Sequence, residues 1–276
     1  MKWIFARRIW MVTVIALWLS PMAWAATQKR SSSTVTARAA ILSDARNAKR
    51  LYGKNVNTRV PPASTTKVMT ALLVLERLSL TDVVTVPEIA TRAQPSKINL
   101  QTGERYRVAD LLYALLLNSA NDASIVLARA VAGSEWEFAR LMNVRAKQLG
   151  AKNTHFANSN GLPTPSEKQY TTPYDMYLIF RAALQYDFFQ EALNYKYKTI
   201  QTIEGRTIAL KSHNRMLFTD WGNRIFGKTG YTRAAKSCFV GYVKNGKSTL
   251  IIGVFGCTKR WEDIRLILRK FGGVLL

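Results

Sequence analysis

Acidic residues are scarce in this chain of 276 residues, which has 17 of them against 40 lysines and arginines. The resulting formal net charge of +23 predicts an anionic partner or surrounding. We exclude nucleic acid as that partner, because the sequence has no arginine-rich tract, no zinc pattern and no aromatic RNA-binding motif. Phosphate-bearing polymers of a cell envelope and anionic lipid head groups remain as candidate partners.

Histidine and cysteine are nearly absent, with two of each. We expect His155 and His213 to be structural or surface residues rather than ligands, and we expect no metal and no cofactor. Repeats and low-complexity tracts are also missing, and 48% of the residues are hydrophobic. This composition is typical of a globular protein and excludes disorder as the default.

The two cysteines are predicted to remain free thiols. Asn245-Gly246 lies between Cys238 and Cys257 and predicts a two-residue hairpin turn. In that register Cys238 faces Gly253 and Cys257 faces Ala234. The offset of four residues along a strand is about 13 Å, beyond the reach of a disulfide.

The longest apolar run lies near the N-terminus, where residues 1–25 contain three cations, an apolar run from Ile9 to Leu19, and an Ala-Trp-Ala cleavage pattern. These features predict a secretory signal peptide, followed by a flexible lead-in over residues 26–37. The apolar run is shorter than the roughly 20 residues of a membrane-spanning helix. We therefore predict an exported protein of the periplasm or cell envelope, membrane-associated if the signal is left uncleaved. Its mature charge would be +20.

Residues 38–276 carry strand-like segments at both ends and helical segments between them. Two short runs split by Asp44 to Lys49 predict an N-terminal hairpin. Helical periodicity follows from Ser64 to Leu78, in two runs that meet at Ser119 to Asn121, and over residues 134–149 and 173–193. The C-terminal part is rich in strands and closes with an amphipathic helix. This order predicts one sheet built from both ends of the chain, with a helical subdomain of roughly residues 80–195 inserted.

Ser64 and Lys67 stand three residues apart in PPASTTKVMTALLVLE, at the start of a predicted helix. Residues at this spacing share a helix face, so the hydroxyl and the amine can come within hydrogen-bond reach. Burial or a nearby cation disfavours the charged form of a lysine and makes it a base. The backbone N–H of Ser64 can also serve as one arm of an oxyanion hole. Alone, the pair is more typical of a helix cap beside a surface lysine.

Two further motifs follow in the sequence. Ser119 and Asn121 lie at a helix junction, where the serine could relay a proton and the amide could hold Lys67 or a substrate carbonyl. Lys228, Thr229 and Gly230 lie in the run IFGKTGYT, at the beginning of a strand-rich segment. A strand edge there can pair with an extended peptide, while the lysine and threonine meet a terminal carboxylate. Gly230 allows close approach, and the N–H of Tyr231 is a second candidate oxyanion donor.

The motifs S-x-x-K, S-x-N and K-T-G, in this order and in these settings, form a strong joint signal. With the segments GERYRVADLLYALLLNSANDAS and MNVRAKQLGAKNTHFANSNGLP, they make the sequence resemble the D-alanyl-D-alanine carboxypeptidase family of low-molecular-mass penicillin-binding proteins. The similarity extends over roughly residues 38–271. It implies an α/β (α+β) fold of the β-lactamase/transpeptidase type, with a five-stranded antiparallel sheet flanked by helices and an all-helical subdomain.

The resemblance also implies an activity and roles for the motif residues. The protein is expected to remove the terminal D-alanine from peptidoglycan stem peptides and to be acylated by β-lactams. Ser64 is then the nucleophile, Lys67 its base, Ser119 and Asn121 the second pair, and Lys228 with Thr229 the carboxylate binders. A DD-endopeptidase, a class A-like β-lactamase and a non-catalytic peptidoglycan-binding protein remain as alternatives.

Two positions depart from the family pattern. Lys236 stands where the family usually has glycine, and Gln169 where a histidine is common. We expect Lys236 to add charge and bulk near the cleft and to alter substrate preference. Neither position removes a proposed catalytic group.

Overall fold

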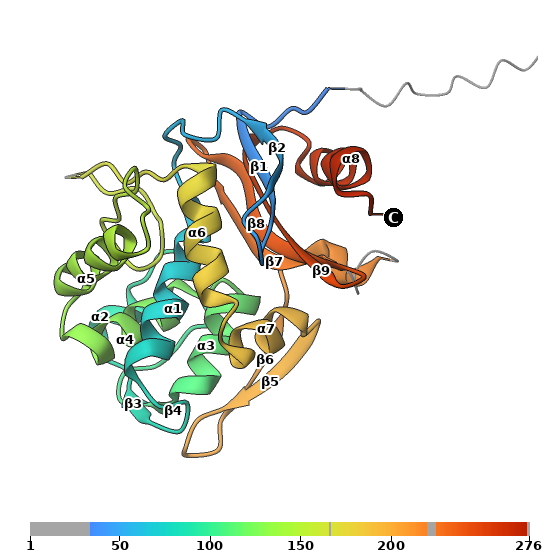
Figure 1. Ribbon diagram of the computed structural model, residues 1–276. Coiled ribbons are helices and arrows are strands. Elements are labelled where there is room, and N and C mark those ends of the chain that lie inside the picture. Colours follow the sequence, from blue (N-terminus) through green and yellow to red (C-terminus); the bar gives the residue numbers. More distant parts are fainter. Residues whose placement is uncertain (1–33, 166, 220–224, 275–276) are drawn as a thin grey trace, which may run out of the picture. The chain divides into compact units, whose positions relative to one another are not determined.

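The main sheet has five antiparallel strands in the order β2-β1-β9-β8-β7 (Figure 1). The computed structural model describes residues 34–165, 167–219 and 225–274, so the predicted signal peptide and most of the lead-in lie outside the described residues. The strands are β1 (Ala39–Asp44), β2 (Arg50–Lys54), β7 (Ile225–Thr232), β8 (Lys236–Asn245) and β9 (Ser248–Cys257). β1 pairs with β2 and with β9, which confirms a sheet built from both ends of the chain.

Helices cover both faces of this sheet. On one face lie α1 (Lys67–Arg77) and α6 (Pro173–Ala183), and on the other lies α8 (Arg260–Gly272). Side chains alternate between the two cores along each strand. Ile41 packs toward α1 and α6, whereas its neighbour Leu42 packs toward α8. The fold is thus a helix-covered antiparallel sheet, as predicted.

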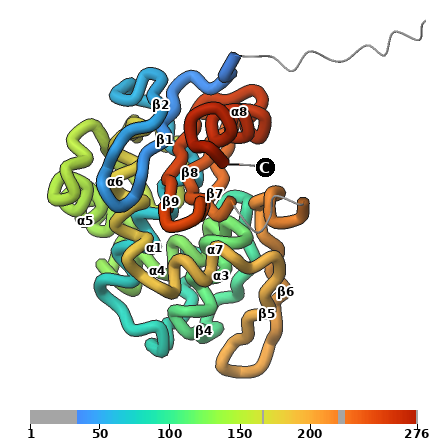
Figure 2. Tube along the Cα trace, turned by 45° about the vertical axis from the view of Figure 1, so that its right-hand side comes forward, coloured from blue at the N-terminus to red at the C-terminus, as the bar shows by residue number. Residues whose placement is uncertain are grey.

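The middle of the chain is mainly helical and surrounds α1, which contacts α3, α4, α5 and α6. The other helices are α2 (Glu88–Thr91), α3 (Val108–Leu117), α4 (Asn121–Ala132), α5 (Glu135–Gln148) and α7 (Asp187–Asn194), with 3-10 helices η1 (Ala63–Thr66) and η2 (Arg215–Phe218). This middle region also contains two small hairpins. One pairs β3 (Val83–Thr85) with β4 (Arg105–Arg107), and the other pairs β5 (Tyr197–Gln201) with β6 (Thr207–Lys211). Figure 2 shows the β5–β6 hairpin beside α3 and α7. Within the described ranges, no helix combines the length and apolar character needed to cross a membrane.

Two helical segments differ from the sequence prediction. The periodicity over residues 173–193 corresponds to two helices, because Tyr186 adopts an extended conformation before α7. The helix predicted from Ser64 begins as the 3-10 turn η1, and α1 starts only at Lys67. Ser64 therefore lies on a separate turn in front of the helix that carries Lys67.

The predicted pairing of β8 with β9 is wrong, because the two-residue turn lies one residue further along the chain than predicted. The turn is Gly246-Lys247, because Gly246 takes the left-handed φ of +58° that favours glycine, while Asn245 stays in the strand. With this turn and a further register shift between Ser237 and Phe239, Cys257 lies opposite Ser237, next to Cys238 in the sequence. Both thiols are nevertheless free, as predicted. The reason is that Cys238 packs toward α1 and Cys257 toward α8, on opposite faces of the sheet.

Candidate active site

Ser64, Lys67 and Asn121 meet beneath the edge of the main sheet. The Lys67 Nζ atom is 3.2 Å from Ser64 Oγ and 2.7 Å from Asn121 Oδ1. A third contact, of 2.9 Å, joins the same nitrogen to the backbone carbonyl of Asn160. With three acceptors around it, the amine is held directly against the serine hydroxyl.

The environment of Lys67 favours a neutral amine. Its side chain is 0% exposed, and this burial is the main reason that its pKa lies well below the usual value. The positive charge of Lys228 lowers that pKa further, while the carboxylates of Glu135 and Asp122 oppose the shift. A neutral lysine at hydrogen-bond distance can accept the proton of Ser64.

Ser119 lies in the junction between α3 and α4, with a left-handed φ of +58° that is unusual for a residue with a side chain. Such a conformation is strained and is retained where surrounding contacts demand it. Here its Oγ atom accepts a 2.9 Å hydrogen bond from Lys228 Nζ. Asn121 is fixed from two sides, because its backbone N–H donates to Ser96 and its side-chain amide donates to Gln94.

Lys228, Thr229 and Gly230 lie on β7, an edge strand of the sheet. Lys228 is 1% exposed, and burial, reinforced by the charge of Arg260, lowers its pKa to about 7. A Cβ atom on Gly230 would lie 3.1 Å from the backbone nitrogen of Ser64, so glycine lets the strand pass close to η1. Tyr231, in contrast, projects outward and is 66% exposed. All eight predicted site residues therefore lie on the three segments that converge here.

Sequence reasoning missed the support beneath Lys67. The Glu135 carboxylate accepts hydrogen bonds from the backbone N–H and the hydroxyl of Ser159, at 3.0 Å and 2.7 Å. Ser159 also accepts from Ser124 and Thr70. These bonds fix the segment whose next residue, Asn160, holds Lys67. In the sequence, this segment stood out only through its resemblance to the family. A contact made by a backbone carbonyl does not depend on the residue type, so the sequence could not indicate it.

The site opens into a cavity of about 1170 Å³ whose wall includes Ser64, Ser119 and Thr229. Its lining also includes four cations, Lys211, Arg215, Lys259 and Arg260, and one acidic residue, Glu262, which pairs with Lys259. Arg260 donates hydrogen bonds to the backbone carbonyls of Gly230 and Cys238. Such a cavity suits an extended ligand that carries negative charge.

His213 also lines the cavity. Desolvation, then the charges of Lys228 and Lys67, lower its pKa to about 4, so the imidazole is neutral at pH 7. Its backbone N–H donates to Leu117 and joins the start of η2 to α3. Among the described residues, no group of three or more His, Cys, Asp or Glu side chains is placed to hold a metal ion.

The two unusual positions lie at the margins of the site. Lys236 is exposed and ends the turn between β7 and β8 with a φ of +56°, next to Ser237, which lines the cavity. Gln169 donates to the backbone carbonyl of Leu162, in the segment that follows Asn160. An effect of Lys236 on substrate preference stays a prediction.

The family description Peptidase S11, D-alanyl-D-alanine carboxypeptidase, matches residues 25–259. The chain belongs to the D-alanyl-D-alanine carboxypeptidase family. Among its relatives in this family, a D-alanyl-D-alanine carboxypeptidase of Bacillus subtilis (DacF) is 33% identical over 90% of this chain and 65% of its own length. The Escherichia coli enzyme DacC is 36% identical over 86% of this chain and 60% of its own length. The chain thus spans less than two thirds of both relatives.

Solved structures share the fold of this carboxypeptidase family member. A D-alanyl-D-alanine carboxypeptidase from Mycobacterium tuberculosis superimposes with a TM-score of 0.80, at 31% identity, over 88% of this chain and 93% of its own. The Streptomyces K15 DD-transpeptidase gives a TM-score of 0.79 at 29% identity, over 87% of this chain and 98% of its own. The predicted β-lactamase/transpeptidase-like fold is confirmed.

Proposed function

We propose that this protein is a serine-type D-Ala-D-Ala carboxypeptidase that removes the terminal D-alanine from peptidoglycan stem peptides. The observation that carries the proposal is the buried Lys67 amine, held 3.2 Å from Ser64 Oγ by Asn121 and Asn160. A serine beside a lysine with a lowered pKa is an activated nucleophile. Membership of the carboxypeptidase family supports the same activity.

In the acylation step, Ser64 Oγ attacks the carbonyl carbon between the two D-alanines, and its proton passes to Lys67 Nζ. The backbone N–H groups of Ser64 and Tyr231 stabilise the negative oxygen that forms. The C–N bond then breaks, and the leaving amine takes a proton through Ser119. D-Alanine departs and leaves the shortened peptide as an ester of Ser64.

The free carboxylate of the substrate positions it for this attack. Lys228 and Thr229 bind that carboxylate, and the edge of β7 pairs with the peptide backbone. The close approach at Gly230 keeps the paired strand beside Ser64. Water then hydrolyses the ester, with Lys67 again accepting a proton, and this regenerates Ser64. A β-lactam would acylate the same serine.

The first experiment tests the nucleophile. Fluorescent penicillin should label the wild-type protein, and Ser64→Ala should abolish the label. The exposed residue Ser79 serves as a matched control, because Ser79→Ala leaves the site intact. Label that persists in Ser64→Ala would contradict the assignment, and rapid turnover of the penicillin would favour a β-lactamase.

The second experiment identifies the reaction. Purified muropeptides, monomeric and cross-linked, are incubated with the protein and their products are analysed by mass. Release of D-alanine from monomers without cleavage of dimers supports the carboxypeptidase. Cleavage of dimers would identify an endopeptidase, and formation of new dimers a transpeptidase, the activity in the name of the Streptomyces K15 protein.

The proposal places the enzyme in the periplasm or cell envelope, where peptidoglycan is found. The signal-like residues 1–25 support export, and the net charge of +23 supports contact with anionic polymers or lipids of the envelope. Detection of the protein in a periplasmic fraction, with or without its first 25 residues, tests both the export and the cleavage.

A further inference from the structure

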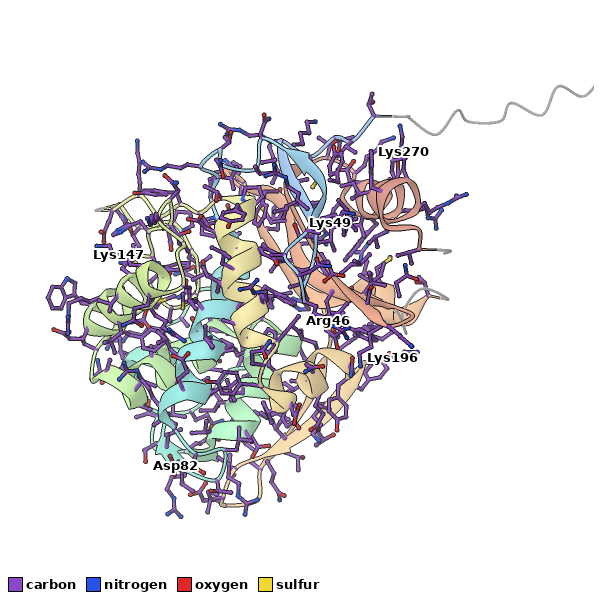
Figure 3. The ribbon with its side chains drawn as sticks, in the orientation of Figure 1. Arg46, Lys49, Asp82, Lys147, Lys196 and Lys270 are labelled. Carbon is purple, nitrogen blue, oxygen red and sulfur yellow. The ribbon has the colours of Figure 1, made fainter. Side chains whose placement is uncertain are left out.

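Seven cations gather at one end of the main sheet, away from Ser64. Three short segments contribute them, the β1–β2 turn, the β8–β9 turn and the end of α8. We call this set the basic end; its members are Arg46, Lys49, Arg50, Lys244, Lys247, Arg269 and Lys270, and all seven are exposed. Figure 3 labels Arg46, Lys49 and Lys270 on the part of the protein that contains β1, β2 and α8.

Direct contacts hold the three segments together. Arg46 donates a 3.3 Å hydrogen bond to the backbone carbonyl of Lys247, which joins the two turns. The side chain of Asn245 donates to the carbonyl of Gly272 at 3.0 Å, which joins the β8–β9 turn to α8. The rings of Tyr52 and Phe271 are 4.6 Å apart, which joins α8 to β2. The three segments that carry the seven charges are therefore fixed relative to one another.

No counter-charge on these segments neutralises the basic end. Their one acidic residue, Asp44, is buried and accepts hydrogen bonds from the backbone N–H groups of Arg46 and Asn47. Among the described residues, none of the seven cations forms an ion pair. Repulsion between these cations makes an anionic partner favourable.

One partly exposed aromatic ring accompanies the charges. Phe271 is 36% exposed at the end of α8, and Lys270 Nζ lies 5.6 Å from the centre of its ring. Cations mixed with exposed aromatic side chains are typical of surfaces that rest on the head groups of a bilayer. A soluble polyanion offers no apolar layer for Phe271, so the mixture favours a lipid surface.

A cavity of about 620 Å³ adjoins the basic end between the β1–β2 turn and α6. Arg46 and Arg181 line it, together with the amides of Gln185 and Gln190. Neither arginine is paired with a carboxylate in the described part of the chain. Two guanidinium groups suit the phosphate of a lipid head group. The amides of Gln185 and Gln190 already donate to the backbone carbonyls of Arg181 and Leu184.

We propose that the basic end docks on an anionic phospholipid bilayer. The inference deepens the proposed function, since it places an envelope enzyme at a membrane surface. On β8, Cys238 pairs with Gly230 beside the site, and Lys244 is six residues further along. This separation is about 20 Å, so a bilayer at the basic end leaves the surroundings of Ser64 accessible to peptidoglycan.

The test measures binding to vesicles by sedimentation, using the chain from residue 26 onward so that the apolar leader cannot insert. Vesicles contain phosphatidylglycerol with phosphatidylethanolamine, or phosphatidylcholine alone. The wild-type protein should bind the anionic vesicles, more weakly as salt rises, and should not bind the neutral ones. The triple variant Lys49→Gln, Lys247→Gln, Lys270→Gln should bind about a hundredfold more weakly, since each cation near an anionic surface contributes roughly fivefold.

The control variant removes the same charge elsewhere, at Lys147, Lys152 and Lys168, which are all exposed and lie outside the three segments of the basic end. Lys147→Gln, Lys152→Gln, Lys168→Gln should bind like the wild type. Equal loss in both triple variants, or wild-type binding to soluble polyphosphate but not to vesicles, would overturn the bilayer proposal. Cleavage of a soluble muropeptide is measured in parallel and should be unchanged in both variants. An inactive wild type would instead contradict the proposed function.

Discussion

At the residue scale, two buried lysines have opposite tasks. In the proposed reaction Lys67 is the base and must be neutral, whereas Lys228 is the carboxylate binder and must be charged. Both have a lowered pKa, mainly because of burial, and the pKa of Lys228 is about 7. The charge of Lys228 also lowers the pKa of Lys67, so a charged Lys228 favours a neutral Lys67.

This pairing predicts a bell-shaped pH dependence of kcat/KM for a D-Ala-D-Ala peptide. The rate should rise as Lys67 loses its proton and fall above about pH 7 as Lys228 loses its charge. Lys228→Arg keeps its charge throughout this range, so the falling limb should move to higher pH. Steady-state kinetics from pH 5 to 10 measure both limbs. A falling limb unchanged in Lys228→Arg would show that another group causes it.

The residues proposed to act through their side chains are those that sequence motifs indicate, and the structure brings them together. Ser64 and Lys67 were recognisable because helical spacing brings residues three apart to one face. Asn160 was not, because it holds Lys67 through its backbone carbonyl. From the sequence, we expected His213 to be a structural or surface residue, because nothing in its local sequence shows that it lines the cavity.

At the element scale, the turn at Gly161 supports the nucleophile. A Cβ atom there would lie 1.9 Å from the carbonyl oxygen of Ala63 and 2.7 Å from Thr66 Oγ1. Gly161 also has a φ of +83°, which favours glycine. The loop after α5 and the 3-10 turn η1 can therefore pack this closely only without a side chain.

We predict that Gly161→Ala lowers both stability and acylation. Gly133→Ala is the matched control, because Gly133 has a similar φ of +77° but no atom within 4 Å of the added Cβ. In the control, the free energy of unfolding should fall by about 1 kcal/mol, which is the cost of the left-handed conformation alone. In Gly161→Ala, the free energy of unfolding should fall by at least about 2 kcal/mol more, because the backbone at Ala63 must move away from the added Cβ atom. Urea denaturation and penicillin labelling measure the two effects. Equal losses would mean that the contact with Ala63 relaxes freely.

Glu135 is predicted to adjust Lys67 from the start of α5. Its negative charge raises the pKa of Lys67 against the lowering effect of burial. Glu135→Gln removes the charge while keeping the shape, so the pKa of Lys67 should fall and the rising limb of the pH profile should move to lower pH. Glu137→Gln, on the same helix but paired with Arg140 and not a contributor to the pKa of Lys67, should leave the profile unchanged. A purely structural Glu135 would change the rate without moving that limb.

The elements themselves were largely predictable, and the exceptions have physical causes. The hairpin β1–β2 and the junction between α3 and α4 follow from local patterns of apolar residues. The β8–β9 turn was misplaced by one residue, because Asn-Gly and Gly-Lys both allow a hairpin and tertiary packing selects between them. The short strands β3 and β4 have three residues each, too few for a periodic signal.

At the scale of the whole molecule, the site affects how stability depends on pH. Lys228 has a pKa of about 7 in the folded state and near 10.4 in an unfolded chain. Between these values the unfolded state binds more protons than the folded state. The contribution of Lys228 to the free energy of unfolding must therefore rise with pH across this window. Lys67, whose pKa is also lowered, acts in the same direction.

Comparison of the wild type with Lys228→Met removes this contribution, together with the effect of Lys228 on the pKa of Lys67 and of His213. The variant leaves Ser119 Oγ without its lysine partner, but that loss does not depend on pH. From pH 7 to 10, the wild type should gain stability relative to Lys228→Met, with a slope that approaches about 1.4 kcal/mol per pH unit. Urea denaturation at a series of pH values gives both curves. Parallel curves would mean that Lys228 keeps an ordinary pKa in the fold, and they would remove the basis for the falling limb of the rate profile as well.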